Sequence, residues 1–217
     1  MEDNDKTLLD RGWRMVQNNI VRISNLVKDL LNYSKERNPE YEPVNPNQLA
    51  EEVCDLFDIK AKGKNITIKR DYDLALGSVV QIFLDQRGIH TCLSNLISNA
   101  IDACEADRAK DQHTIIVKTS EDTEGGMIFE VSDDGTGMTE ETKRKLFSSF
   151  YSTKGSRGTG LGLLVTSKIV YEHRGEMFFD SQSGVGSRFI IKLPANSSSQ
   201  PGEIQKVFSS PGSTLIN

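Results

Sequence analysis

The sequence has few cysteines, no excess of basic residues and no long apolar run. Its three cysteines, Cys54, Cys92 and Cys104, are odd in number and lack CxxC spacing, so we expect buried reduced thiols. A net charge of -5, with acids and bases interspersed, offers no basic face to a nucleic-acid backbone. No run approaches the roughly 18 apolar residues of a membrane helix, and the acidic start is unlike a signal peptide. We therefore expect a cytoplasmic location, which a cytoplasmic piece of a membrane protein would share.

Proline is absent from residues 7–37, where Gly12 is the only glycine, and this stretch predicts a long helix. Its apolar residues are spaced alternately four and three apart: Leu9, Trp13, Val16, Ile20, Ile23, Val27 and Leu30. A helix of this length extends about 45 Å, and Val21, Leu26 and Leu31 widen the heptad seam beyond a two-stranded one, which favours packing into a helical bundle. The alternative is a helix that lies on the core of its own domain.

Prolines are concentrated in the next stretch, NPEYEPVNPN, where they end the helix and predict an extended connector. We expect four parts: a long helix over 1–38, a linker over 39–47, a folded domain over 48–194 and a disordered tail over 195–217.

Helical and strand patterns alternate through the domain. We expect helices capped by Asn45 or Asn47, by Asp85 and by Thr139, and a fourth from Gly160 to His173. Apolar side chains that should be buried on these helices are Leu49, Val53, Leu56, Phe57 and Ile59; Ile89, Leu93, Leu96, Ile97, Ala100 and Ile101; and Leu161, Leu164, Val165, Ile169 and Val170. Alternating or apolar runs predict strands at 66–72, 79–84, 113–120 and 127–133 and a closing hairpin around SGVG.

Two glycine clusters stand out between Asp133 and Leu163: DDGTGM and, after LFSSFYSTK, GSRGTGLGL. Glycine lets backbone amides approach a phosphate closely, so the pair predicts a nucleotide pocket with a mobile cover. Either cluster alone could be an ordinary glycine turn.

Asp133, at the end of a predicted strand, is well placed to accept a hydrogen bond from an exocyclic amine such as that of adenine. Gly135 and Gly137 would let the chain turn beneath the base. Asp134 could be only a turn former, and the residues alone favour neither acid. Lys154, beside the second cluster, could neutralise phosphate charge or could be ordinary surface charge.

Asn95, Asn99 and Asp102 fall on one face of the helix predicted after Asp85. Asparagine is a poor helix former, and an Asn99 oxygen with water could complete the octahedral shell of a magnesium ion shared with phosphates. The alternative is a solvated polar face.

These motifs, in this order, resemble the catalytic half of bacterial sensor histidine kinases, whose ATP-binding domain is shared with DNA gyrase and MutL. LSNLISNAIDAC resembles the N box, DDGTGM the G1 box, LFSSFYSTK the F box and GTGLGL the G2 box. The N-terminal VRISNLVKDLLNYSK resembles the second helix of the dimerisation hairpin. The resemblance implies an α/β two-layer sandwich with a mixed sheet under three helices, ATP between the layers, a homodimer and a response regulator as partner.

The resemblance also implies residue roles. Asn99 would bind magnesium, Asp133 the adenine amine, and Ser187 the adenine through water. Lys154 and the backbone of the second cluster would bind phosphate, at Gly158, Thr159, Gly160, Leu161 and Gly162.

Asn95 separates branches of the superfamily. Gyrase-like ATPases carry a water-activating glutamate there, and a neutral amide cannot act as a general base, so hydrolysis should be slow. The phosphoryl group would then pass to a histidine, but His90, His113 and His173 all lack the phosphoacceptor context. We expect that histidine upstream of this chain or in another protein. The alternatives are a related serine kinase and an ATP-gated interaction module.

Overall fold

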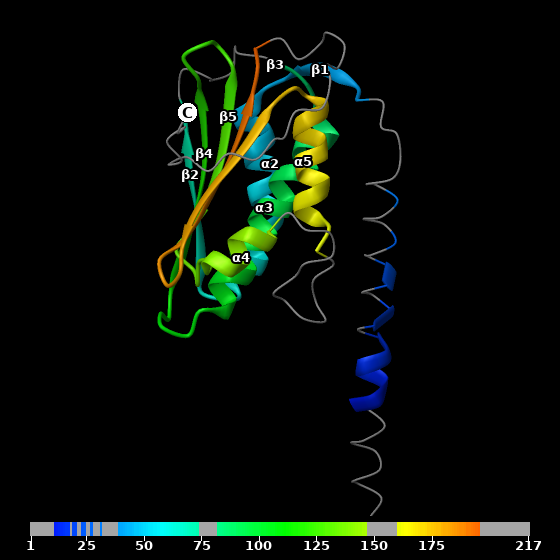
Figure 1. Cartoon of the computed structure of the whole chain (residues 1–217), viewed down its shortest axis with the longest axis vertical. Helices are drawn as coiled ribbons and strands as arrows, with labels where there is room; N and C mark the ends of the chain where they lie inside the picture. The colour runs from blue at the N-terminus through cyan, green and yellow to red at the C-terminus, as the bar shows by residue number, and fades with distance from the viewer. Residues whose placement is uncertain are drawn as a thin grey trace, which may run out of the picture.

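Two layers form the folded domain in this computed structural model, which describes residues 11–17, 19–20, 23–24, 27, 31, 39–73, 82–146 and 160–195. Three helices cover one face of a five-stranded sheet (Figure 1). The strand order is β2-β4-β5-β7-β6, with β2 parallel to β4 and every other neighbouring pair antiparallel. The strands are β2 Ile66–Tyr72, β4 His113–Glu121, β5 Met127–Asp133, β6 Glu176–Gln182 and β7 Gly186–Leu193. The expected mixed sheet under three helices is confirmed.

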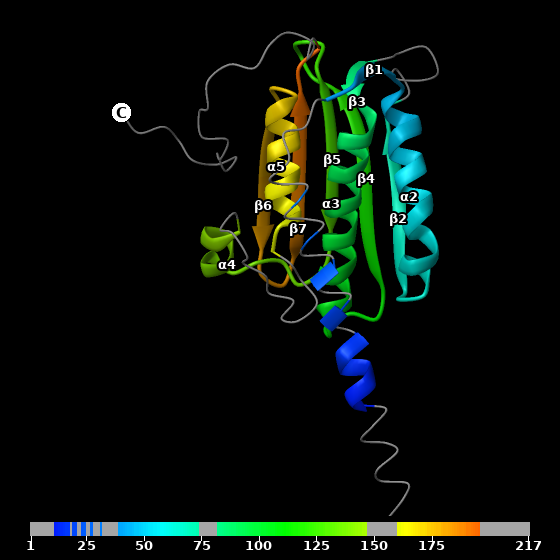
Figure 2. The same ribbon diagram turned by 90° about the vertical axis from the view of Figure 1, so that its right-hand side faces the viewer.

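The covering helices are α2 Pro46–Lys62, α3 Gln86–Ala106 and α5 Gly162–Glu172, and a short α4 Glu140–Lys145 lies near the β6 end of the sheet (Figure 2). The predicted caps are confirmed, because the side chains of Asp85 and Thr139 accept hydrogen bonds from the first-turn N–H groups of α3 and α4. Of the two candidates before α2, Asn45 is the cap, and its side chain accepts from the N–H of Gln48 at 3.0 Å.

The core lies between the helices and the alternate, inward-facing residues of the strands. Every apolar residue predicted to be buried on α3 is buried, and all three cysteines are buried free thiols. The prediction for α2 was wrong at Leu56 and Ile59, which are 65% and 86% exposed. The prediction is confirmed at Leu49 and Val53, and the other buried residues of α2 are Pro46, Ala50, Cys54 and Ala61.

On α5 the buried side is close to the predicted one, since Val165, Ile169 and Val170 are in the core. The helix begins at Gly162, two residues later than expected. Leu164 is only partly buried, and the neighbouring Leu163 packs against the core in its place.

A second, two-stranded sheet joins the predicted linker to the domain. β1 Tyr41–Val44 pairs antiparallel with β3 Ile82–Asp85. The Tyr41 hydroxyl donates to the carbonyl of Glu172 at 2.8 Å, and the Asp85 N–H donates to Nε2 of His173 at 3.0 Å. The connector is therefore extended as expected, and it is also fastened to the end of α5.

Every described residue between 11 and 31 is helical. The described seam residues are exposed, from 48% for Val27 to 63% for Trp13, so these side chains do not pack on the domain's own core. In the described part of the chain, no helix combines the length and apolar character that crossing a membrane requires.

Candidate nucleotide-binding site

Asp133 is the last residue of β5 and lies on the same side of that strand as Phe129 and Val131, toward the helices. Ser187 of β7 is its cross-strand partner, is buried, and has its Oγ 3.1 Å from Oγ of Ser181. Asp133 and Ser187 therefore form one polar spot at an end of the sheet, between the two layers.

The surroundings of Asp133 disfavour its charged form. Burial raises the pKa of its carboxyl to about 6, and the backbone N–H groups of Gly135 and Ser187 only partly offset this effect. The Gly135 N–H donates to Oδ1 at 3.0 Å. Because its hydrogen bonds offset only part of the cost of burial, this half-buried carboxylate would be stabilised by a further hydrogen-bond donor.

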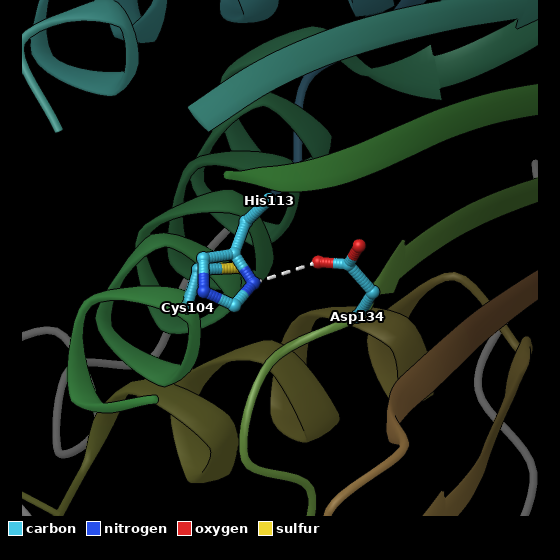
Figure 3. Close-up of side chains that lie close together, drawn as sticks. All are labelled: Cys104, His113 and Asp134. Atoms are coloured by element: carbon cyan, nitrogen blue, oxygen red, sulfur yellow. Dashed lines mark hydrogen bonds and ion pairs between the residues drawn. The ribbon is translucent and has the colours of Figure 1, made fainter. Parts of the chain in front are cut away.

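Asp134, the adjacent acid, is bound elsewhere (Figure 3). Its Oδ1 lies 2.9 Å from Nδ1 of His113 and accepts from the N–H of Thr114 at 3.0 Å, and its carbonyl accepts from Nζ of Lys110 at 2.7 Å. The structure thus distinguishes the two acids between which the sequence could not choose. Asp134 is bonded to residues at the start of β4, whereas Asp133 faces the space between the layers.

The glycines after Asp133 are required by the packing of the protein itself. A Cβ on Gly135 would come within 2.6 Å of the Ala103 backbone on α3. Gly137 has a φ of 60°, and a Cβ there would lie 1.9 Å from the carbonyl oxygen of Gln182. The Thr136 N–H also donates to the Ala103 carbonyl, so this loop is held against the last turns of α3.

Asn95, Asn99 and Asp102 lie on α3 and are all partly buried. Because Asp102 precedes Ala103, the loop after Asp133 lies beside the same end of the helix. Amide and carboxylate oxygens are ligands that magnesium accepts, so this face fits the predicted ion in chemical type.

The start of α5 has no side-chain cap. Its N-cap residue, Leu161, makes no side-chain cap hydrogen bond, and the first turn holds no acid. Gly160 has a φ of 70°, and the Leu161 side chain is buried, so only the backbone here could face a phosphate. Lys154, Gly158 and Thr159, which we expect to bind phosphate, lie outside the described residues.

One contact that the sequence did not indicate joins the two helices of the site. Nδ2 of Asn95 donates to the carbonyl of Gly162 at 3.0 Å and to Oγ1 of Thr166 at 3.2 Å. Thr166 is fully buried, and its hydroxyl donates to the same Gly162 carbonyl at 2.9 Å. The sequence feature that could have indicated this contact is the hydroxyl of Thr166, which lies on the otherwise apolar side of α5.

A half-buried acid at a strand end, a polar helix face and a helix start without a side-chain cap are the features expected of a nucleotide-binding α/β sandwich. Residues 84–197 match the sequence profile of the histidine kinase-, DNA gyrase B- and HSP90-like ATPase family. The chain belongs to this family and contains an ATP-binding catalytic domain of the histidine kinase kind.

Relatives place the chain among the kinases of that family. Sporulation kinase E of Bacillus subtilis (strain 168) is 28% identical over 188 residues, which are 87% of this chain and 24% of that protein. A nucleotide-free structure of the catalytic domain of histidine kinase ThkA is 30% identical, with a TM-score of 0.62, and the match covers 73% of this chain and 97% of that domain. The structure of ThkA in complex with response regulator protein TrrA is 28% identical, with a TM-score of 0.68 and coverage of 86% and 51%. This chain thus spans about a quarter of the length of the curated kinase and nearly all of the solved catalytic domain.

Proposed function

We propose that this chain transfers the γ-phosphoryl group of ATP to a histidine outside the chain, as the catalytic part of a two-component signalling kinase. The observation that carries the proposal is Asn95. Its amide occupies the position of the water-activating glutamate of the hydrolysing relatives, and its Nδ2 is bonded to Gly162 and Thr166. An amide has no basicity with which to activate water, so the phosphoryl group is kept for another nucleophile.

The proposed binding residues form two groups, one that contacts the adenine and one that contacts the phosphates. Asp133 accepts from the adenine amine, and Ser187 contacts the base through water. The backbone at Gly160 and Gly162 and the Lys154 side chain bind the phosphates. Asn99 would hold a magnesium ion, which when bound neutralises phosphate charge, and Asp102 on the same helix face would contact the nucleotide.

Two of the three histidines of the domain are poor phosphoryl acceptors. His173 is fully buried and both its ring nitrogens are hydrogen-bonded, to the Ile169 carbonyl and the Asp85 N–H. His113 is buried and bonded to Asp134. An imidazole from another helix would attack the γ-phosphorus, forming an N–P bond as the P–O bond to ADP breaks and the ring gives up a proton to solvent.

The proposed partners follow from this chemistry. The phosphoacceptor would lie on the first helix of a dimerisation hairpin, packed against the helix of residues 1–38 in a homodimer. The phosphoryl group would then pass to a response regulator, and the ThkA complex with TrrA supports this partner class.

The test is to mix the chain with labelled ATP and a separately produced dimerisation hairpin. We expect an acid-labile, alkali-stable phosphoprotein, and no label when the hairpin histidine is replaced by glutamine. An acid-stable serine phosphate would indicate the related serine kinases. Tight ATP binding without transfer to any partner would indicate an ATP-gated interaction module.

A further inference from the structure

Three side chains from three parts of the chain lie close together (Figure 3), and one of them, Asp134, is the neighbour of Asp133 in the sequence. Cys104 lies in the last turn of α3, His113 begins β4, and Asp134 follows β5. The sulfur, a ring nitrogen and a carboxylate oxygen of these residues all lie within 4.8 Å of one another. None of the three has a role in the proposed phosphoryl transfer.

The imidazole of His113 is buried and faces the carboxylate of Asp134. Its side chain is 4% exposed, and Nδ1 is taken by Asp134. Nε2 is buried and has no hydrogen-bond partner among the described residues. The two ring nitrogens point to different sides of the ring, so the nitrogen that a cation bound to Asp134 would share is Nδ1, and Nε2 would then carry the ring proton.

Asp134 gives the cluster access to solvent. Its side chain is 40% exposed, whereas the Cys104 and His113 side chains are buried. The ammonium of Lys110 lies 3.9 Å from Oδ2 of Asp134, so a positive charge already lies at this opening. An incoming cation would displace it.

We propose that Cys104, His113 and Asp134 form a binding site for a thiophilic divalent cation such as Zn²⁺. A thiolate, an imidazole and a carboxylate are the ligand types that Zn²⁺ takes in proteins, and water can fill a fourth position. Tetrahedral coordination at ordinary Zn–ligand lengths puts the ligand atoms roughly 3.3–3.6 Å apart. A cluster within 4.8 Å therefore needs to contract by only about 1 Å.

The protons balance simply. As the metal–sulfur bond forms, the Cys104 thiol proton leaves to solvent. The imidazole stays neutral, because its single N–H proton is carried by the ring nitrogen that does not bind the metal. The site gains one divalent cation and loses one proton.

The competing interpretation is a reactive cysteine beside a histidine and an acid. Cys104 is 1% exposed, and burial, followed by the nearby carboxylates of Asp133 and Asp134, raises the pKa of its thiol to about 12. Such a thiol is covered and protonated, so it is a poor nucleophile. The same two carboxylates attract a cation.

The test uses the full chain, purified with a chelator and titrated with Zn²⁺ by calorimetry and with Co²⁺ by absorbance. We expect one metal per chain and a thiolate-to-cobalt charge-transfer band in the near ultraviolet. Cys104→Ser should remove the band and weaken Zn²⁺ binding about a hundredfold or more, since loss of even an outer-shell partner costs 10- to 100-fold. Cys54→Ala is the matched control, because Cys54 is also a buried thiol but contacts Tyr72.

Asp134→Asn provides an independent test on a partly exposed side chain. The amide oxygen can still accept from the Thr114 N–H, so the fold should be retained, while Zn²⁺ affinity should fall at least tenfold. The proposal is wrong if the full chain binds no Zn²⁺ at micromolar concentration, or if Cys104→Ser and Asp134→Asn bind it as tightly as Cys54→Ala does. Circular dichroism of each variant checks that the fold is intact.

Discussion

At the scale of single residues, two adjacent acids have different surroundings. Asp133 faces the space between sheet and helices, where burial raises the pKa of its carboxyl to about 6. Asp134 is bonded to His113 and Thr114 on the side of β4. Their order in the sequence could not reveal this, because it depends on which residues β4 and β7 bring alongside the end of β5.

Asp133→Asn should weaken nucleotide binding roughly a hundredfold, because a charge-assisted hydrogen bond to the adenine amine is lost or reversed. Asp134→Asn should change the affinity less than about threefold, which lies within the effect of a surface substitution. Adenosine is the ligand to titrate, since it has no phosphate that ionises in the same pH range. Retained affinity in Asp133→Asn would show that the adenine assignment is wrong.

The same substitution should have the opposite effect on folding. The carboxyl of Asp133 has a pKa of about 6 in the folded protein, above its ordinary value of 3.8. Its ionisation therefore destabilises the fold progressively as the pH rises from 3.8 to about 6, by a constant amount above that range and not at all below about pH 4. Asp133→Asn should therefore raise the free energy of unfolding at neutral pH by up to about 3 kcal/mol. Urea unfolding without nucleotide, at neutral pH and near pH 4, measures this gain. An equal gain at both values would exclude ionisation as its cause.

At the scale of elements, local signals predicted the helix starts and long-range contacts decided the rest. Asp85 and Thr139 could be identified as caps because a cap bonds within its own first turn. Leu56 and Ile59 could not be assigned, since helical spacing accepts several overlapping stripes and only the sheet decides which one is buried. β1 has no periodic signal because it is only four residues long and its burial does not alternate, and its pairing with β3, about forty residues away, leaves no local trace.

The loop after Asp133 shows a non-local requirement for glycine. Gly137→Ala should cost more than about 3 kcal/mol of folding stability, since the methyl group would overlap the Gln182 carbonyl and φ is positive. Gly184→Ala is the matched control: its φ of 76° is also positive, but nothing lies within 4 Å of the added Cβ. That variant should lose only about 1–2 kcal/mol.

Urea unfolding of the two glycine variants, side by side, measures the difference. Equal losses would mean that backbone strain alone accounts for both, and that the loop can move away from the β6–β7 turn without cost.

At the scale of the whole molecule, the described seam residues of the N-terminal helix are apolar and exposed, so the domain does not cover them. Trp13, the only tryptophan of the chain, is 63% exposed on that seam. We expect two chains to pair along it, because a row of exposed apolar side chains of this length favours association.

Trp13 reports the pairing directly. Its emission should shift to shorter wavelength as the protein concentration rises through the micromolar range, with a matching increase in sedimentation coefficient. Replacing Ile20 and Val27 by serine should abolish both changes and leave the emission at the long-wavelength limit. A sedimenting monomer with invariant emission would contradict the predicted homodimer.

The two-stranded sheet of β1 and β3 has a mechanical consequence. Asp85 caps α3 with its side chain and bonds His173 with its backbone, and Tyr41 bonds the last turn of α5. The far ends of both helices that border the nucleotide site are thus fixed to one ribbon, which follows the N-terminal helix in the chain. A rotation of that helix would be transmitted through this ribbon to α3 and α5 together, and both helices border the ATP site.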